Sequence, residues 1–258
     1  MRPLVQLSFD IEEFDMPLEY GHPIDAARQL ALGRKGLERI LPLLEGEGPR
    51  TSLFTTAHFA ETFPDDIRGL ARRHEIASHA YYHSRYETGH LATSRRRLEE
   101  IAGMPVKGLR MPRMRQVPMS DISEAGYAYD ASVHPTWLPG RYNNLHMPRT
   151  LYRSEGMPRV PASVSPWFRI PLFWLAFKNY PYRWYLHLCR RVLEADGYLS
   201  LYYHPWEFTD VRGCGLPGYT VRGCEGWLLE RLHRLVDDLQ READFVSMDE
   251  LVARRLKG

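Results

Sequence analysis

The sequence predicts an α/β fold in which a largely parallel sheet closes into a barrel. Strand-like and helix-like segments alternate along nearly the whole chain, and seven or eight such repeats favour a barrel over an open doubly wound sheet. Polar residues directly follow four of the predicted strands, which is where barrel enzymes assemble their sites. The 258 residues, 44% of them hydrophobic and 26% charged, are sufficient for one large α/β domain.

The first predicted elements are a strand, a helix, a strand, a helix and a strand. Residues 4–9 form a mainly apolar run that Asp10 closes, and 26–44 carries leucines at helical spacing before Gly46. The next three elements are a Thr-rich strand, a helix and a short strand, at 51–56, 59–73 and 75–78.

The later elements follow the same alternation. We expect helices at 86–102, 120–125, 182–195, 226–242 and 249–255, and strands at 106–109, 128–131, 198–203 and 244–246. The longest break in the pattern, at about 135–171, is rich in Pro, Asn and aromatic residues. Because similar segments flank it, we predict a single domain over 1–258 with an aromatic-rich insertion at about 135–185.

The charge balance argues against nucleic acid as a partner. Lys and Arg number 34 against 32 Asp and Glu, and a formal net charge of +2 is too small for binding that depends on neutralising phosphates. The amino terminus has no long apolar signal region, so we expect the protein in the cytoplasm.

The three cysteines, Cys189, Cys214 and Cys224, do not imply a disulfide framework. Their odd number leaves at least one thiol free. A Cys214–Cys224 bridge or a second small metal site is the alternative.

The stretch Ser78-His79-Ala80-Tyr81-Tyr82-His83, after a predicted strand, indicates a metal site. Two imidazoles four residues apart share one face if they lie on a helical turn, so both can bind one ion. A carboxylate from another strand end would complete the set of ligands. Two partly buried histidines in an aromatic loop are the simpler alternative.

Asp10 and Glu12 are the candidate carboxylates. In an extended segment their side chains point the same way, whereas Glu13 points oppositely. One of the pair could bind metal while the other stays free as a base.

Arg110 and His204 also follow predicted strands. A guanidinium before the turn at Pro112 can hold a catalytic carboxylate and keep it ionised. His204 lies between aromatic residues where Pro205 stops the strand, which makes it a candidate general acid opposite a metal-bound water. A surface cation and a core histidine are the simpler alternatives.

Four motifs together resemble those of the NodB-type polysaccharide deacetylases, carbohydrate esterase family 4. They are Phe9-Asp10-Ile11-Glu12, the stretch from Ser78 to His83, Arg110-Met111-Pro112, and Tyr203-His204-Pro205-Trp206-Glu207. The resemblance covers about 4–252, and the first and last motifs are most similar to the exopolysaccharide-biosynthesis branch.

This resemblance implies a distorted (β/α)7-type barrel and a divalent metal. The metal would be Zn2+, with Co2+, Mn2+ or Ni2+ as alternatives, and its ligands would be Glu12, His79 and His83. Asp10 would be the general base, Arg110 the residue that orients it, and His204 the general acid. We expect Tyr82, Pro112, Arg113 and Trp206, next to these residues in the motifs, to contact the substrate.

The chain departs from the common family pattern in two places. Ile11 stands where most members have a second, metal-binding aspartate, so that the next carboxylate comes one residue later. Ala80 replaces the usual Ser or Thr of the second motif. Some relatives with altered first motifs are metal-independent amide hydrolases, which makes metal binding the less secure expectation.

The function that follows is hydrolysis of N-acetyl groups, or less often O-acetyl groups, on a sugar of a polysaccharide or lipid-linked glycan. The alternatives are a hydrolase for a small non-peptide amide, as in allantoinase-like relatives, and a catalytically weak carbohydrate-binding protein.

Residues 166–185 carry nine aromatic side chains, which we expect to pack in the core. The sharper alternative is a surface that binds sugars or rests on the inner face of a membrane.

Overall fold

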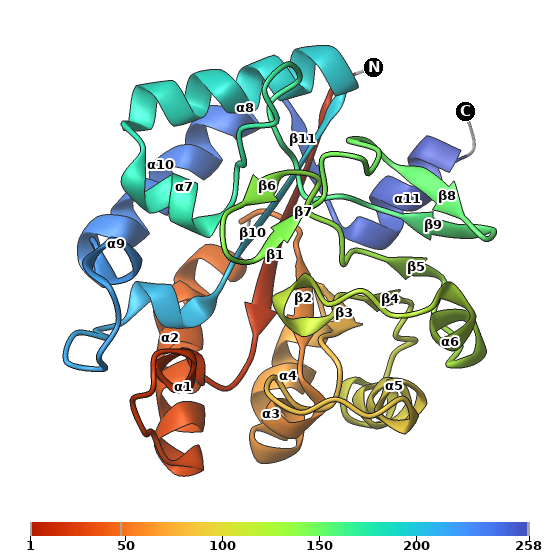
Figure 1. Cartoon of the computed structure of the whole chain (residues 1–258), viewed down its shortest axis with the longest axis vertical. Helices are drawn as coiled ribbons and strands as arrows, with labels where there is room; N and C mark the ends of the chain where they lie inside the picture. The colour runs from red at the N-terminus through yellow and green to blue at the C-terminus, as the bar shows by residue number, and fades with distance from the viewer. Residues whose placement is uncertain (1, 47, 257–258) are drawn as a thin grey trace.

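The computed structural model describes residues 2–46 and 48–256 and has the predicted α/β fold (Figure 1). The strands are β1 (Leu4–Ile11), β2 (Ser52–Thr55), β3 (Glu75–Ser78), β4 (Gly108–Leu109), β5 (Tyr129–Asp130), β6 (Trp137–Leu138), β7 (Tyr142–Asn143), β8 (Tyr152–Ser154), β9 (Met157–Arg159), β10 (Tyr198–Tyr203) and β11 (Asp244–Val246). The α-helices are α1 (Met16–Glu19), α2 (Ala26–Leu44), α3 (Ala57–Thr62), α4 (Pro64–Ala71), α5 (Gly89–Ala102), α6 (Met119–Glu124), α7 (Trp174–Asn179), α8 (Tyr182–Asp196), α9 (Gly218–Val221), α10 (Gly226–Gln240) and α11 (Met248–Leu256). Two 3-10 helices are η1 (Pro112–Met114) and η2 (Pro205–Phe208).

The main sheet runs in the order β10-β1-β2-β3-β4-β5-β9-β8. All its pairs are parallel except β8 with β9. The two halves of β1 have different neighbours on one edge, because its first residues pair with β11 and its last with β2. The first strand of the chain therefore lies in one sheet with the last.

The sheet curls into an incompletely closed barrel. After β9, Ser163 N donates to Ser200 O of β10 at 2.9 Å, and Ser200 N donates to Ser163 Oγ at 2.9 Å. These two bonds join the segment after β9 to β10, which lies at the other edge of the sheet. The predicted barrel is thus confirmed, in its distorted form.

Alternation along β1 separates the barrel interior from the outer layer. Val5 and Leu7 belong to the larger hydrophobic cluster, which includes the helices around the sheet, whereas Leu4 belongs to a smaller one with Phe54 and Ala77. Leu4 shares its face with Gln6, Ser8 and Asp10. The interior therefore becomes polar toward the carboxyl end of β1.

Close packing of α2 holds the segment that follows β10. Gly33 and Gly36 face the backbone of Glu12 and of Pro205, and a methyl group at either glycine would collide with a carbonyl oxygen there. Only a residue without a Cβ allows this approach. Helix α2 thus contacts the backbone at Glu12 and at Pro205, which lie close in sequence to Asp10 and His204.

Two sequence-based expectations differ from the structure, and one alternative is excluded. The helix expected at 59–73 is divided into α3 and α4, because Phe63 leaves the helical region (φ −128°) before Pro64, which has no N–H to donate. The segment at 135–185 supplies β9 to the main sheet, so it is more than an insertion. The Cys214–Cys224 bridge does not form, since all three cysteines are free thiols.

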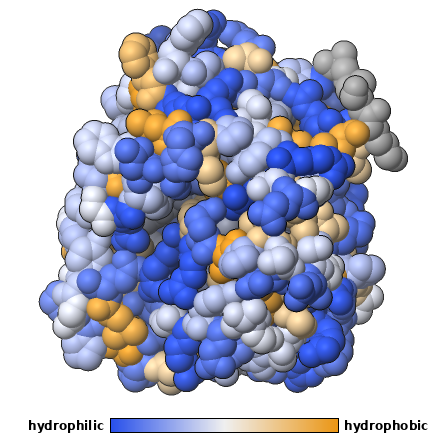
Figure 2. Space-filling view, turned by 45° about the vertical axis from the view of Figure 1, so that its right-hand side comes forward, coloured by the Kyte–Doolittle hydropathy of each residue, from blue (hydrophilic) through white to orange (hydrophobic). Residues whose placement is uncertain are grey.

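The nine aromatic residues at 166–185 include both buried and exposed side chains. Phe173, Trp174, Phe177 and Tyr185 are buried, as core packing requires, whereas Trp167 and Phe168 are 83% and 85% exposed. Figure 2 shows one face of the molecule, on which hydrophilic residues dominate and hydrophobic ones gather in small separate groups. Within 2–46 and 48–256, every helix is too short or too polar to cross a bilayer.

The packing of α2 leads to a prediction. Gly36→Ala places a methyl group against the Pro205 carbonyl, so we expect it to lower the free energy of unfolding by about 1–3 kcal/mol and to reduce turnover by moving η2. The matched control is Gly69→Ala in α4, where, apart from the adjacent residues and the nearby backbone of the same helix, no described atom lies within 4 Å of the added methyl group. Urea unfolding of both variants checks this. Equal stabilities for the two would contradict the account.

Candidate active site

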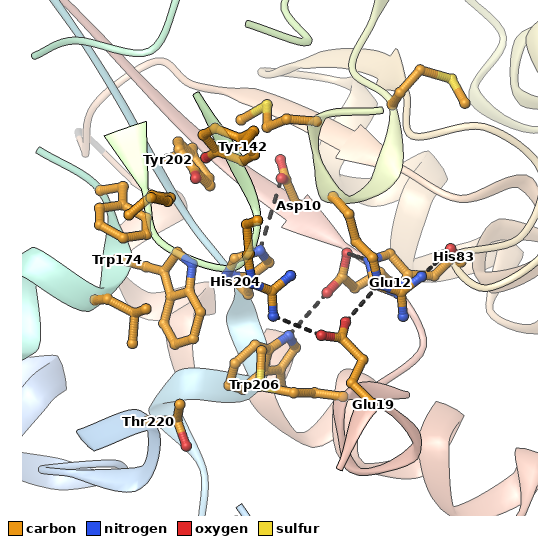
Figure 3. Close-up of a pocket in the computed structure, with 18 of the residues that line it drawn as sticks. Asp10, Glu12, Glu19, His83, Tyr142, Trp174, Tyr202, His204, Trp206 and Thr220 are labelled. Atoms are coloured by element: carbon orange, nitrogen blue, oxygen red, sulfur yellow. Dashed lines mark hydrogen bonds and ion pairs between the residues drawn. The ribbon is translucent and has the colours of Figure 1, made fainter. Parts of the chain in front are cut away.

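A cavity of about 480 Å³ opens where β1, β3, β4 and β10 end, and most of the candidate residues line it (Figure 3). Asp10 and Glu12 come from the end of β1, His79 and His83 from the loop after β3, and His204 from the end of β10. The carboxyl ends of neighbouring parallel strands meet at one edge of the sheet, which explains why residues far apart in sequence converge here.

Glu12, His79 and His83 form a buried cluster. Glu12 Oε2 lies 3.0 Å from His79 Nε2 and 3.2 Å from His83 Nε2. The other imidazole nitrogens are occupied, since His79 Nδ1 bonds to Arg110 O at 2.8 Å and His83 Nδ1 to Asp15 Oδ1 at 2.6 Å. Such partners fix the ring orientation and turn both Nε2 atoms toward Glu12.

The arrangement fits a divalent metal. Among the described residues, Glu12 Oε2 is buried and has no well-aligned hydrogen bond despite the two nearby imidazoles, while Glu12 Oε1 accepts from Trp206 Nε1 at 3.1 Å. These three residues also form a group whose ligand atoms all lie within 4.8 Å of one another. One carboxylate oxygen facing two imidazole nitrogens is a typical Zn2+ donor set with a position left open for water or substrate.

The protonation of the cluster supports the same interpretation. Burial alone would raise the pKa of Glu12, but the neighbouring His83, His204 and His79 lower it well below its usual range. Burial would lower the pKa of His83, whereas Glu12 and Asp15 raise it to about 9. The carboxylates that favour a proton on His83 would equally favour a metal cation in its place.

A loop, and not a helical turn, brings the two histidines together. Ala80 has a positive φ of 61°, and its carbonyl accepts from Ala57 N at 3.1 Å. His79 and His83 are stacked with ring centroids 5.7 Å apart. The helical turn that we considered for these residues is therefore wrong. The imidazoles of His79 and His83 nevertheless lie on the same side, facing Glu12.

Asp10 and Arg110 form a second buried pair. Arg110 Nη1 donates to Asp10 Oδ1 at 2.5 Å, and Arg110 Nη2 donates to Ser8 Oγ at 3.0 Å. The guanidinium also lies over the Phe54 ring, 4.0 Å from its centroid. An arginine held in this way fixes the orientation of the aspartate.

His204 lies across from Asp10, with Nε2 3.9 Å from Asp10 Oδ2. Its ring is stacked on Trp206 and contacts the edge of Trp174, as Figure 3 shows. Burial would lower the pKa of His204, but the carboxylates of Glu12, Glu207 and Asp10 raise it above its ordinary value. A histidine that holds a proton at neutral pH can act as a general acid.

The four residues expected to contact substrate lie in two different places. Arg113 and Trp206 line the cavity, whereas Tyr82 and Pro112 line a smaller neighbouring pocket. Tyr82 packs between His58 and His90, with ring centroids 5.2 and 5.6 Å away, and this packing keeps it out of the larger cavity. Tyr82 and Pro112 thus lie in a pocket next to the one that holds Asp10 and His204, and their contact with substrate stays a prediction.

Arg113 and Trp206 also have protein partners. Arg113 donates to Asp15 at 3.1 Å and to Glu19 at 2.5 Å, and Trp206 donates to Glu12. Both side chains therefore hold charged groups of the site in place.

Sequence reasoning missed several residues that complete the site. Asp15 holds His83, Glu207 holds His204, and the Tyr142 hydroxyl on the cavity wall lies 2.8 Å from Nδ1 of the buried His134. Asp15 and Glu207 lie three residues beyond Glu12 and His204, and this short distance in sequence could have identified them as candidate site residues. Tyr142 gave no such signal, because the β6–β7 hairpin that carries it has no strong strand pattern.

Comparison with solved structures shows similarity in fold. A protein from Mycobacterium smegmatis assigned as a polysaccharide deacetylase matches 97% of this chain and 89% of its own, at 20% identity and a TM-score of 0.62. A protein from Pseudomonas aeruginosa PAO1 with the same assignment matches 96% of this chain and 88% of its own, at 17% identity and a TM-score of 0.64. Puue allantoinase matches 96% and 88% of the two chains, at 17% identity and a TM-score of 0.63.

No family model matches the sequence, and no curated protein does. The structural similarity extends over almost the whole chain at low identity. The chain therefore has the fold shared by these polysaccharide deacetylases and Puue allantoinase.

Proposed function

We propose that the protein is a metal-dependent hydrolase that removes acetyl groups, chiefly N-acetyl groups, from a sugar of a polysaccharide or lipid-linked glycan. One observation carries this proposal. The buried Glu12 Oε2, without a well-aligned hydrogen bond, faces Nε2 of both His79 and His83 in the cavity that also holds Asp10 and His204. A cation site, a base and an acid thus border one space.

Glu12, His79 and His83 would hold the metal, for which we propose Zn2+, with Co2+, Mn2+ or Ni2+ as alternatives. When bound, such a cation polarises an acyl oxygen and lowers the pKa of a coordinated water.

Asp10 is the proposed general base. Its Oδ1 is occupied by Arg110, so Oδ2, on the side of His204, is the oxygen that takes the proton from the attacking water. Arg110 is itself buried and anchored by Ser8, which keeps Asp10 in one orientation.

His204 is the proposed general acid. Its Nδ1 is held by Glu207 at 3.1 Å, which leaves Nε2 on the side of the cavity. From there Nε2 would donate its proton to the departing amine nitrogen. Cleavage of an amide needs this proton because an unprotonated amine anion is a poor leaving group.

A hydrolase for a small amide is the second candidate, since the similarity to Puue allantoinase is as large as that to the two proteins assigned as deacetylases. The aromatic wall formed by Trp174, Tyr202 and Trp206 favours a sugar. The resemblance of the first and last motifs further favours a role in exopolysaccharide biosynthesis.

Metal binding provides the first test of the site. We expect purified protein to hold close to one equivalent of metal by mass spectrometry and Glu12→Gln to lose most of it, because a neutral amide is a weak ligand. The matched control is Glu13→Gln. Glu13 is equally buried but bonds to Thr56 Oγ1 at 2.6 Å, and burial raises its pKa, so this change should preserve metal binding. Equal metal contents in both variants would contradict the assignment.

Acetate release from a panel of acetylated oligosaccharides and lipid-linked sugars tests the reaction. We expect Asp10→Asn and His204→Ala each to lower turnover by roughly two to four powers of ten, the usual contribution of one general base or acid. Chelation should abolish activity and added zinc or cobalt restore it. Allantoin is included in the panel.

Turnover of allantoin without acetate release would favour the second candidate. Near-normal turnover in both variants would remove Asp10 and His204 from the mechanism. Sugar binding without acetate release, with the metal site filled, would indicate a carbohydrate-binding protein.

Contact with a membrane surface is a separate proposal, supported by the exposure of Trp167 and Phe168. Their loop is held by Arg169 Nη1, which donates to Met147 O at 2.7 Å, and by the bond from Ser165 N to Ile170 O at 2.9 Å. We expect the double variant W167A/F168A to pellet less with anionic liposomes than the native protein or the W184A control. The absence of lipid-dependent pelleting in the native protein would rule the contact out.

A further inference from the structure

Lys178 is a fully buried lysine beside the candidate active site. It lies in α7, in the segment at 135–185, and its Nζ donates to Thr220 O at 2.9 Å. Nζ also lies 2.9 Å from Glu207 Oε2, and both side chains have 0% exposure. The ring centroids of Trp174 and Trp206 are 4.9 and 5.7 Å from Nζ.

Glu207 links this lysine to His204. Glu207 Oε1 accepts from the backbone N–H of His204 at 2.8 Å and lies 3.1 Å from His204 Nδ1. One oxygen of the carboxylate is thus directed at the imidazole and the other at the ammonium group. Lys178, Glu207 and His204 form a continuous line of contacts that ends at the cavity.

Stability alone does not account for this arrangement. A buried ion pair often stabilises a protein no more than apolar residues of the same size, because both charges must be removed from water. The rings of Trp174 and Trp206 and the groups Thr220 O and Cys224 Sγ surround the Lys178 ammonium group, so that it has no contact with bulk water. A function that needs a charged carboxylate explains the pair better.

The electrostatics agree with that geometry. Glu207 is buried in the same region as Glu12 and Asp10, and burial by itself would raise the pKa of its carboxyl group. Lys178 makes the largest opposing contribution, followed by His204, and the pKa of Glu207 falls below its ordinary value. Without Lys178, Glu207 would be a buried carboxylate with only an imidazole to balance it.

We propose that Lys178 is a positioning residue that keeps Glu207 ionised, so that Glu207 accepts a hydrogen bond from His204 Nδ1 and leaves the proton on Nε2 available to the cavity. The consequence for catalysis rests on the proposed function, whereas the effect on His204 does not. A protonated Glu207 could instead donate to Nδ1, and His204 could then no longer be stabilised with protons on both nitrogens.

The test uses a double-mutant cycle of Lys178→Met, Glu207→Gln and the double variant. We expect each single change to lower kcat by roughly 10- to 100-fold, as loss of a partner that orients a catalytic group does, with KM and metal content unchanged. The double variant should be no slower than E207Q alone, because Lys178 acts only through Glu207. Normal kcat in K178M, or a double variant slower than E207Q, would overturn the proposal.

A second readout does not depend on the substrate. In ¹⁵N-histidine-labelled protein, with the His204 resonances assigned from an H204Q sample, E207Q and K178M should both shift the His204 nitrogen signals, and in the same direction. His204 signals that K178M leaves unchanged would overturn the proposal. If native protein releases no acetate, the proposed function fails, and this spectrum still decides the role of Lys178.

One further variant and the double variant control for folding. Arg149→Met removes the partner of Asp196, which ends α8 at the opposite end of β10 from His204. It should lower stability without changing kcat or the His204 signals. If K178M does not fold, the double variant K178M/E207Q replaces it, because that variant has neither buried charge. Its kcat should equal that of E207Q. A lower kcat would count against the proposal.

Discussion

Three carboxylates buried at or directly behind one cavity are the constraint on which the rest of the structure depends. The negative charges of Asp10, Glu12 and Glu207 would repel one another if they were buried without cationic partners. Each has its own cationic partner. Arg110 pairs with Asp10 and Lys178 with Glu207, while Glu12 faces two imidazoles that would share a metal with it. Charge compensation therefore assigns a different task to each carboxylate.

The backbone makes this compensation available. Alternation along β1 places Ser8 and Asp10 on the inner face, and Arg110 at the end of β4 binds both. Helix α2 comes close to the backbone of Glu12 and Pro205 only because Gly33 and Gly36 lack side chains. The positive φ of Ala80 then turns the loop so that both imidazoles point at Glu12. The site depends on these local features as much as on the barrel itself.

The sequence was sufficient for the barrel and for the central residues of the site, because both follow from periodicity and from short motifs. The strand ends that carry Asp10, His79, Arg110 and His204 were apparent from apolar runs closed by polar residues. The contribution of β9 was missed because Met157–Arg159 lies in the Pro- and aromatic-rich region at about 135–171, where no regular helix or strand pattern flanks it.

Contacts between distant segments could not be predicted from local patterns. Lys178 lies in the aromatic-rich segment at about 135–185, outside every helix that the sequence predicted, and only the fold places it against Glu207. Likewise, Tyr82 reads as part of the second motif, yet the turn at Ala80 and the packing on His58 direct it away from the cavity. The sequence indicated the type of chemistry, whereas the supporting contacts required the three-dimensional structure.

The most direct test of the central claim is anomalous X-ray diffraction at the zinc edge from crystals grown with one equivalent of zinc. The account predicts a single strong peak bonded to Glu12 Oε2 and to Nε2 of His79 and His83, at about 2.0–2.2 Å from each. The Nδ1 bonds from His79 to Arg110 O and from His83 to Asp15 should be retained. A zinc peak at another position would contradict the account. So would the absence of metal at saturating zinc, with Glu12, His79 and His83 joined by hydrogen bonds instead.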